Sequence, residues 1–170
     1  MKIEELRSFI GDETMEMLKT LVEVLAKQKH GTIAIVSDYS GRKNAEIKRF
    51  CETNRAVRLD TEFTCIKDEE GKIKWNEEQL LSLTGIDGAL FIDLQGNCFA
   101  FSVLLDGIAK IKGDVGRGAR YNSVVNYIKQ KKKGKYIAII SGDLSAVKAA
   151  VEAVENVKPA KVGVSVVQSQ

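Results

Sequence analysis

The sequence predicts an α/β fold, a single layered domain whose mixed central β-sheet is flanked by helices. Short apolar runs rich in β-branched residues alternate along the chain with stretches of helical periodicity. Two neighbouring apolar runs are separated by only a short turn, which indicates a hairpin and therefore a sheet that is not purely parallel. Because the chain has 170 residues, 44% of them hydrophobic, we expect residues 1–170 to form one domain around one core.

The first forty residues predict two helices and a strand. Apolar residues at positions 3, 6 and 10 share one helical face. A second helix is expected after Gly11, with Asp12 as its N-cap, because apolar residues at positions 18, 21, 22 and 25 follow the i, i+3, i+4, i+7 spacing. Residues 32–36 (TIAIV) are a short β-branched run, which predicts a buried strand.

The middle of the chain is less regular. Residues 41–60 are charged and weakly periodic, and they predict no defined element. Residues 62–75 predict two short strands around a turn at residues 69–71. Asn76 is expected to cap a helix that runs through Leu83, with two glutamates in the first turn, where the helix dipole favours them.

Two further strands are predicted at residues 89–92 and 98–105, joined by a hairpin connection at residues 94–97. Neither run alternates strictly between apolar and polar residues, so we expect both to be central strands covered on both faces. A glycine-rich loop then leads into a helix that begins near Ala119 and has an apolar stripe.

The last forty residues predict strand, turn, helix and strand. Residues 136–140 form another buried apolar run. A turn follows at residues 141–143, where Asp143 is the expected N-cap of a helix over residues 144–154. A final strand is expected at residues 161–167.

Composition argues against several classes of function. The net charge of +3 and an aromatic content of 6% do not predict a nucleic-acid surface. The three cysteines lack metal-site spacing and His30 is the single histidine, so no conventional zinc site is expected and a reducing compartment fits best. No apolar run reaches about 18 residues and the start lacks a signal-peptide core, so we expect no membrane segment and a cytoplasmic location.

The commonest nucleotide-binding and hydrolase motifs are absent. There is no G-x-x-x-x-G-K-[ST] loop, and the glycines of GDVGRGAR lack the G-x-G-x-x-G spacing after a clear strand. A Ser/His/Asp triad has no candidate, because His30 lies in a helix-to-strand turn with no motif around it. We interpret His30 as a surface histidine.

Two segments remain, GIDGALFID at residues 85–93 and GRGARYNSVV at residues 116–125. Together they resemble the diadenylate cyclase domain family, including that of bacterial DNA-integrity scanning proteins, in which a DGA motif is followed by a G-T-R-H-R motif. LVEVLAKQKHGTIAIVSD and YIAIISGD are also similar to parts of that family. The resemblance implies a diadenylate-cyclase-like fold and ATP or another adenine nucleotide as the ligand.

In that family two domains meet face to face, and the ribose hydroxyl of each bound ATP attacks the α-phosphate of the other, giving cyclic di-AMP and pyrophosphate. The resemblance therefore implies a homo-oligomer and a divalent metal ion, Mg²⁺ or Mn²⁺. Phosphoryl transfer depends mainly on positioning and charge neutralisation, so Asp87 would be the catalytic carboxylate and metal ligand. Gly88 and Ala89 would bring the backbone close to the nucleotide because their side chains are small.

The second segment is expected to bind phosphate at the start of a helix, where free amides favour anions. Arg120 is the expected catalytic and phosphate-binding guanidinium, and Ser123 would add a hydroxyl donor. Tyr121 and Asn122 replace the histidine and the second arginine of the family motif. The loss of one charge-assisted contact costs about 2–4 kcal/mol in a transition state, so binding would survive these changes better than turnover. The nucleotide-binding residues implied here are Gly118, Ala119, Arg120, Tyr121, Asn122 and Ser123.

Structural explanations compete with each of these assignments. Asp87 and Gly88 also fit a simple turn, and Arg120 also fits a solvated helix start. Tyr121 shares a helical face with apolar residues and fits a packing role, while Asn122 fits a capping or surface role. Asp143 resembles an acidic position of the family and is a weaker second metal-ligand candidate, but helix capping explains it equally well.

Three functions follow from the residues and the resemblance. The first is a diadenylate cyclase that uses ATP and a divalent metal, supported by the intact DGA motif. The second is a catalytically inactive sensor that binds an adenine nucleotide, supported by the altered second motif. The third is an interaction domain that has kept the fold and lost the pocket, which the retained Asp87 and Arg120 oppose.

Overall fold

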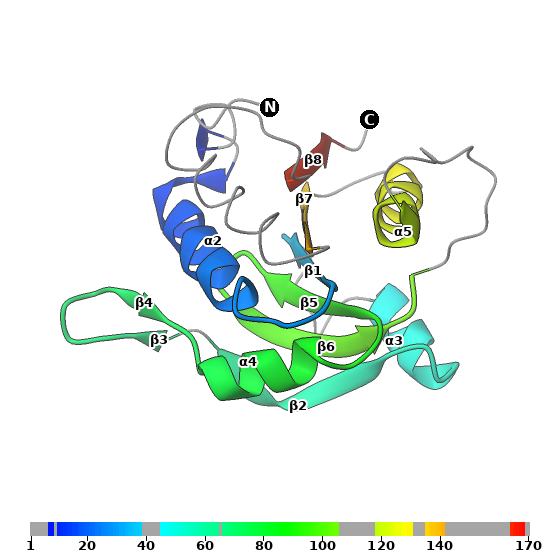
Figure 1. Cartoon of the computed structure of the whole chain (residues 1–170), viewed down its shortest axis with the longest axis horizontal. Helices are drawn as coiled ribbons and strands as arrows, with labels where there is room; N and C mark the ends of the chain where they lie inside the picture. Colours follow the sequence, from blue (N-terminus) through cyan, green and yellow to red (C-terminus); the bar gives the residue numbers. More distant parts are fainter. Residues whose placement is uncertain are drawn as a thin grey trace.

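A computed structural model of the chain describes residues 7–8, 10–38, 45–64, 66–105, 118–130, 135–141 and 164–168. Its centre is a six-stranded sheet with the strand order β2-β6-β5-β1-β7-β8 (Figure 1). The strands of this sheet are β1 (Thr32–Ser37), β2 (Val57–Thr64), β5 (Ala89–Asp93), β6 (Asn97–Val103), β7 (Lys135–Ser141) and β8 (Val164–Gln168). The helices of the described part are α2 (Asp12–Leu25), α3 (Ala45–Glu52), α4 (Glu77–Thr84) and α5 (Gly118–Lys129).

The sheet is mixed, as the sequence predicts. Its central strand β1 runs parallel to β5, with Ile33 opposite Ala89, and antiparallel to β7, with Ile33 opposite Ile140. The pairs β2–β6, β5–β6 and β7–β8 are antiparallel, and β5 and β6 form the predicted hairpin. These observations confirm the α/β class and the mixed central sheet.

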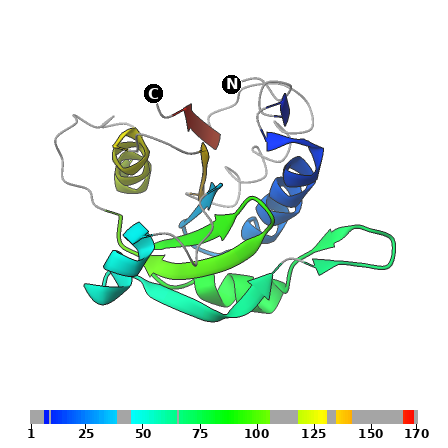
Figure 2. The ribbon, with the colours of Figure 1, turned by 180° about the vertical axis from the view of Figure 1, so that it is seen from behind.

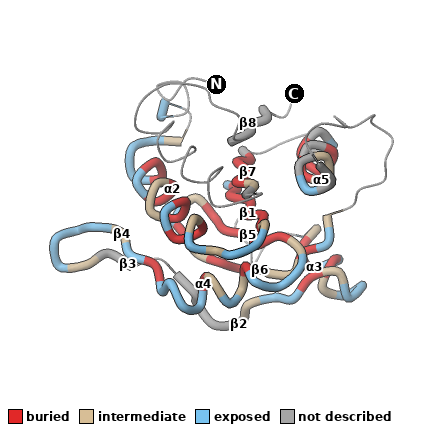
Figure 3. The backbone as a smooth tube through the Cα atoms, viewed as in Figure 1, coloured by how far each residue is buried: buried red, intermediate tan, exposed pale blue. Residues whose placement is uncertain are grey.

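Helices cover both faces of the sheet, so apolar residues on both faces of the central strands are buried. On β1, Ala34 and Val36 pack in one cluster with α2 and α4. The intervening residues Ile33 and Ile35 pack in a second cluster with α3 and α5. Figure 3 shows the buried residues gathered along β1, β5 and β7 and on parts of α2 and α5. The expectation of central strands covered on both faces is confirmed for residues 89–92 and 98–103. The second strand ends at Val103, two residues earlier than predicted, and Leu104 is exposed.

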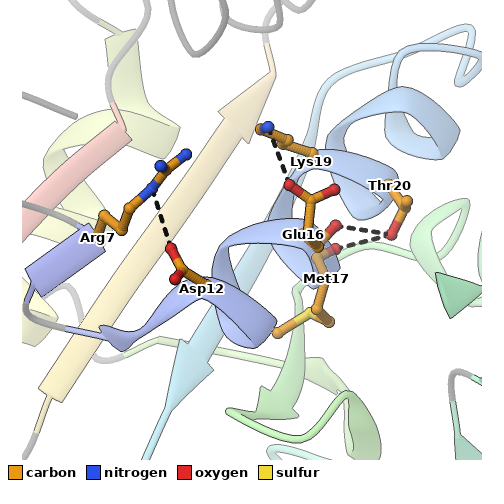
Figure 4. Close-up of polar contacts among 6 residues, drawn as sticks. All are labelled: Arg7, Asp12, Glu16, Met17, Lys19 and Thr20. Carbon is orange, nitrogen blue, oxygen red and sulfur yellow. Dashed lines mark hydrogen bonds and ion pairs between the residues drawn. The ribbon is translucent and has the colours of Figure 1, made fainter. Parts of the chain in front are cut away.

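The start of α2 differs from the prediction, because Gly11 and not Asp12 is the N-cap. The carbonyl of Gly11 accepts the first helical hydrogen bond, from the amide of Met15 at 3.1 Å. Asp12 is the first helical residue, and its carboxylate pairs with Nε of Arg7 at 3.2 Å (Figure 4). Asp12 therefore contributes a first-turn charge to the helix dipole and no side-chain cap.

The prediction for α4 is confirmed. Asn76 caps the helix, its side-chain oxygen accepting a hydrogen bond from the amide of Gln79 at 3.1 Å. Just before the cap, the buried Trp75 donates its indole N–H to the hydroxyl of Thr20 on α2 at 3.0 Å. The hydroxyl of Thr20 also hydrogen-bonds to the helix carbonyls of Glu16 and Met17 (Figure 4). These contacts hold the two helices together on one face of the sheet.

Residues 41–60 contain two elements that the sequence did not predict. Helix α3 buries Ile47 and Phe50, a stripe too short to stand out among charged neighbours. Strand β2 is at the edge of the main sheet, and its sequence, VRLDTEFT, mixes charged and apolar residues. An edge strand with charged side chains is a common protection against pairing with other chains.

The small sheet confirms the two short strands predicted around residues 69–71. Strands β3 (Ile66–Lys67) and β4 (Ile73–Lys74) are antiparallel and project from the main body (Figures 1 and 2). In the turn, Asp68 accepts backbone hydrogen bonds from Lys72 at 2.9 Å and Glu70 at 3.0 Å. The bond from the Lys72 amide, above all, keeps the pKa of Asp68 below its usual value.

Several predictions lie outside the described residues. These are most of the helix expected over residues 3–10, the glycine-rich loop at residues 106–117, and the helix at residues 144–154 together with Asp143. The last predicted strand is present as β8, which begins at Val164. Among the described helices, none combines the length and the apolar character that are needed to cross a bilayer.

Candidate nucleotide-binding pocket

A pocket of about 370 Å³ opens at the edge of the main sheet where β1 and β5 begin. Because these two strands are parallel, the segments that lead into them meet at this edge. The α2–β1 connection contributes the first side of the pocket, the α4–β5 connection the second, and the first turn of α5 the third. The lining residues are His30, Gly31, Thr32, Ile33, Thr84, Gly85, Ile86, Asp87, Gly88 and Arg120. Ligand pockets are typically about 300–1,000 Å³, so this volume suits a small organic ligand.

The structure brings together the two segments that the sequence singled out. Asp87 and Gly88 come from the DGA segment, Arg120 comes from the start of α5, and all three line this pocket. Asp87 and Arg120 are both exposed, so both charged groups are accessible to a ligand. Asp87 and Gly88 lie in the short connection between α4 and β5, whereas the hairpin connection lies after β5. A simple turn therefore stays a competing explanation for this pair of residues.

Gly88 is required by the sheet itself. Its φ angle is +104°, and a Cβ atom would lie 2.6 Å from the carbonyl carbon of Ser102 and 2.9 Å from the amide nitrogen of Val103. Ser102 also has a positive φ, of 51°, and β6 shifts its register against β5 on either side of Phe91. Bulges of this kind are common beside functional sites. Close packing of two strands thus explains the glycine, and contact with a nucleotide stays a prediction.

Ala89 faces the core. It is 1% exposed and packs in the cluster between the sheet and the α3 and α5 helices. Its small size is therefore explained by packing between layers. A role in bringing backbone close to a nucleotide stays a prediction for Ala89 as well.

The α4–β5 connection is fixed by a side chain of the α2–β1 connection, Gln28. Nε2 of Gln28 donates to the carbonyl of Leu81 at 2.7 Å and to the hydroxyl of Thr84 at 2.9 Å. The hydroxyl of Thr84 in turn donates to the carbonyl of Leu80 at 2.8 Å. Through these bonds the last turn of α4, and with it the segment that carries Asp87, is tied to the α2–β1 connection.

The first turn of α5 is held by residues further along the helix. Val124, Tyr127 and Ile128 are buried against the sheet, and the Tyr127 hydroxyl donates a hydrogen bond to the Glu46 carboxylate on α3. Burial, and secondarily the bond to Glu46, raises the pKa of Tyr127 far above its usual value. These contacts place the start of α5 at the pocket and leave the guanidinium of Arg120 exposed there.

The other residues of the second motif are helical, and their roles stay predictions. Asn122 and Ser123 are half-buried on α5. The side chains of Gly118, Ala119 and Tyr121 lie outside what the structure describes. The expected packing role of Tyr121 therefore has no observation for or against it.

Two further residues line the pocket, although the sequence does not predict them as site residues. His30 is exposed, as predicted, but it lines the pocket, and its Nε2 atom would lie 3.8 Å from a Cβ atom on Gly85. Thr32 is 3% exposed, and its hydroxyl has no hydrogen-bond partner among the described residues. No motif surrounds either residue, and the parallel pairing of β1 with β5 that brings them to the pocket cannot be deduced from a short stretch of sequence.

A divalent metal ion fits this pocket only together with a ligand that brings its own donors. Among the described residues, no group of three or more His, Cys, Asp or Glu side chains could hold a metal ion. Asp87 supplies one accessible carboxylate. Mg²⁺ is commonly bound by one or two carboxylates together with substrate phosphates, and Asp87 matches that arrangement.

Comparisons with known proteins give partial similarities. The family model described as BMC domain matches residues 123–169, well under half of the chain. The chain is also similar to the crystal structure of DacA from Staphylococcus aureus, a double mutant, with 17% identity over 83% of this chain and 92% of that chain and a TM-score of 0.44. No curated protein matches the chain. At this identity and TM-score the similarity establishes neither family nor function, so both depend on the residues of the pocket.

Proposed function

We propose that the pocket at the start of β1 and β5 binds an adenine nucleotide, with ATP as the expected ligand. The observation that supports this most directly is the meeting of Asp87 and Arg120 in one pocket, although they are far apart in sequence. These are the two charged residues that the resemblance to diadenylate cyclases assigns to nucleotide binding. The volume of about 370 Å³ is compatible with a ligand of this class.

Arg120 and the start of α5 would bind the phosphates. A guanidinium can donate two parallel hydrogen bonds to a phosphate, and the first amides of a helix have no partner within the helix. In the described structure Arg120 lies in the first turn of α5 and is exposed at the pocket. Both kinds of donor would then serve the same part of the ligand.

Asp87 would hold a Mg²⁺ or Mn²⁺ ion that arrives with the phosphates. Such an ion neutralises phosphate charge and orients the reacting groups of a nucleotide. The chain itself fixes Asp87 through the close contact of Gly88 with β6 and through the bonds of Gln28 to the end of α4. This rigidity favours a binding site that exists before the ligand arrives.

Two functions use such a site, a diadenylate cyclase and a sensor without turnover. The retained Asp87 supports the cyclase. Tyr121 and Asn122 stand where the family has a histidine and a second arginine, which supports the sensor. We favour nucleotide binding without efficient turnover, because two departures fall in one motif and each lost charged contact slows such chemistry on the order of a hundredfold or more.

The test combines titration calorimetry with mass spectrometry. ATP is titrated into the full chain with Mg²⁺ or Mn²⁺, and the mixture is then analysed for cyclic di-AMP. We expect binding that weakens in Asp87→Asn and a product at or near background. Product formation at an ordinary enzymatic rate would establish the cyclase instead. If ATP does not bind, the proposal is wrong and an interaction domain becomes the better explanation.

A further inference from the structure

Thr32 has a buried hydroxyl group whose hydrogen-bonding capacity is unused within the described structure. The residue is 3% exposed, and the Oγ1 atom is buried without a partner among the described residues. A buried hydroxyl without a partner destabilises a protein, and such groups are rare in folded chains. Valine has nearly the same shape and suits a buried strand better, so the threonine needs an explanation.

The neighbouring hydroxyl in the same pocket is different. Thr84 is 3% exposed, but its hydroxyl donates to the carbonyl of Leu80 and accepts from Gln28. The hydroxyl of Thr84 therefore has a structural role, because it bonds to the last turn of α4. Thr32, at the first position of β1, is the buried pocket hydroxyl that the described protein leaves unpaired.

The position of Thr32 separates it from the proposed phosphate site. Alternate residues of a strand point to opposite faces, so Thr32 shares its face with Ala34 and Val36, which pack with α2 and α4. Arg120 is on α5, which covers the opposite face. The pocket thus extends across the end of the sheet, from Arg120 on the α5 side to Thr32 on the side of α2 and α4.

Apolar surface is also available in the α4–β5 connection. Ile86 lines the pocket and is 46% exposed, one of the large hydrophobic side chains that the fold does not bury. A flat base would cover such a side chain, and a hydroxyl in the same pocket would bond to a ring nitrogen or a sugar hydroxyl. An exposed apolar side chain and a buried unpaired hydroxyl in one pocket match a nucleoside better than a phosphate.

We infer that Thr32 is a specificity-determining residue whose hydroxyl forms a hydrogen bond to the nucleoside part of the ligand. This inference rests on the proposed nucleotide-binding function. It assigns the two sides of the pocket different tasks: the α5 side binds phosphate, and the Thr32 side distinguishes a nucleotide from phosphate alone.

The experiment measures the Kd of ATP and of inorganic tripolyphosphate, together with the Tm, for the full chain and three variants. For Thr32→Val we expect ATP binding about tenfold weaker, tripolyphosphate binding unchanged, and a Tm about 2–4 °C higher because an unpaired buried hydroxyl is removed. Thr32→Ser should keep wild-type ATP binding.

Thr14→Val is the matched control. Thr14 is 8% exposed and lies outside the pocket lining, and its hydroxyl already donates to the carbonyl of Leu94 at 3.2 Å. The same chemical change should therefore lower the Tm at this position and leave both Kd values unchanged. We therefore expect Thr32→Val to raise the Tm and weaken ATP binding, and Thr14→Val to lower the Tm and leave ATP binding unchanged.

Each contrary result has a distinct meaning. If wild type binds ATP and Thr32→Val binds it equally well, the inference is overturned and nucleotide binding stands. An equal loss of ATP and tripolyphosphate binding would place Thr32 at the phosphates and overturn the assignment to the nucleoside. A lower Tm in Thr32→Val would show that the hydroxyl has a partner within the protein, which also overturns it. If wild type does not bind ATP, the proposed function and this inference are both wrong.

Discussion

Residues 85–88 and the first turn of α5 both line the pocket, but the protein holds them in place by different means. In the first segment the constraint is on the backbone, because Gly88 approaches the backbone of Ser102 and Val103 more closely than a Cβ atom would allow. In the second segment the anchors are buried side chains further along the helix, Val124, Tyr127 and Ile128. Arg120 itself is exposed and takes no part in that packing.

This difference determines what substitutions can reveal. A change at Gly88 alters the shape of the sheet edge, so its effect on a ligand is mixed with its effect on folding. A change at Arg120 removes a charged group from the pocket and leaves the packing of α5 in place. The two segments should therefore respond very differently in stability measurements and in binding measurements.

The largest effect is expected for Gly88→Ala. A positive φ and a clash with the adjacent strand together cost about 2–6 kcal/mol in the free energy of unfolding. Gly85→Ala is the control, because Gly85 has a φ of −73° and the atoms nearest its added Cβ are at 3.1 and 3.3 Å. Its expected cost is below about 1 kcal/mol. Urea denaturation of both variants measures the difference, and equal stability would mean that β5 and β6 are not packed as described.

Arg120→Ala should change binding and not stability. The loss of a charge-assisted bond to phosphate costs about 1.5–3 kcal/mol, which weakens ATP binding roughly 10- to 150-fold. The free energy of unfolding should stay within about 0.5 kcal/mol of wild type, because the side chain is exposed. Arg58→Ala is a matched control, since Arg58 is exposed on β2 and lies outside the pocket lining. If both variants bind ATP like wild type, Arg120 is a solvated helix-start residue.

Tyr127→Phe gives the smallest effect and tests the anchor of α5. Removal of the hydrogen bond to Glu46 should cost about 1 kcal/mol at neutral pH and leave ATP affinity unchanged. The pKa of Tyr127 is raised in the folded protein, so the folded state keeps its proton above pH 10.0, where the unfolded chain releases it. Stability from this group is present below that pH and is lost as the pH rises further.

The measurement for Tyr127 is a series of denaturation curves from neutral to alkaline pH. Wild type should lose stability more steeply above about pH 10 than Tyr127→Phe does. Parallel pH profiles would show that the hydroxyl is not buried against Glu46. Weaker ATP binding in the variant would show that the start of α5 depends on this anchor more than on the rest of its packing.

Local sequence patterns were sufficient for elements that are defined by local interactions or by burial on both faces. Residues 33–36 of strand β1 are a continuous apolar run, and the α4 cap is a side-chain-to-backbone bond within four residues. The edge strand β2 and the short helix α3 lack such a pattern, since each mixes charged with apolar residues. At the start of α2 the sequence favours Asp12 as the N-cap because aspartate is a common cap, whereas the N-cap is Gly11, which has a positive φ.

The residues of the candidate site also fall into two groups, those that a sequence motif predicts and those that depend on strand pairing. Asp87 and Arg120 belong to motifs that can be recognised in the sequence, and the structure places both at one pocket. The constraint on Gly88 and the unpaired hydroxyl of Thr32 depend on what lies beside them in three dimensions. That information comes from the pairing of β5 with β6 and of β1 with β5, which no short stretch of sequence contains.

The place of β1 at the centre of the sheet has a consequence for how the chain is made. Ile33 is paired with Ala89 on one side and with Ile140 on the other, so both partners are synthesised long after it. At about 5–20 residues per second, β1 waits roughly 5–20 s on the ribosome before both of its edges can be covered. During that time a strand whose four inner residues are all apolar is open to association with other nascent chains. Productive folding of this protein should therefore depend on chaperones that shield residues 32–37 until β7 has emerged.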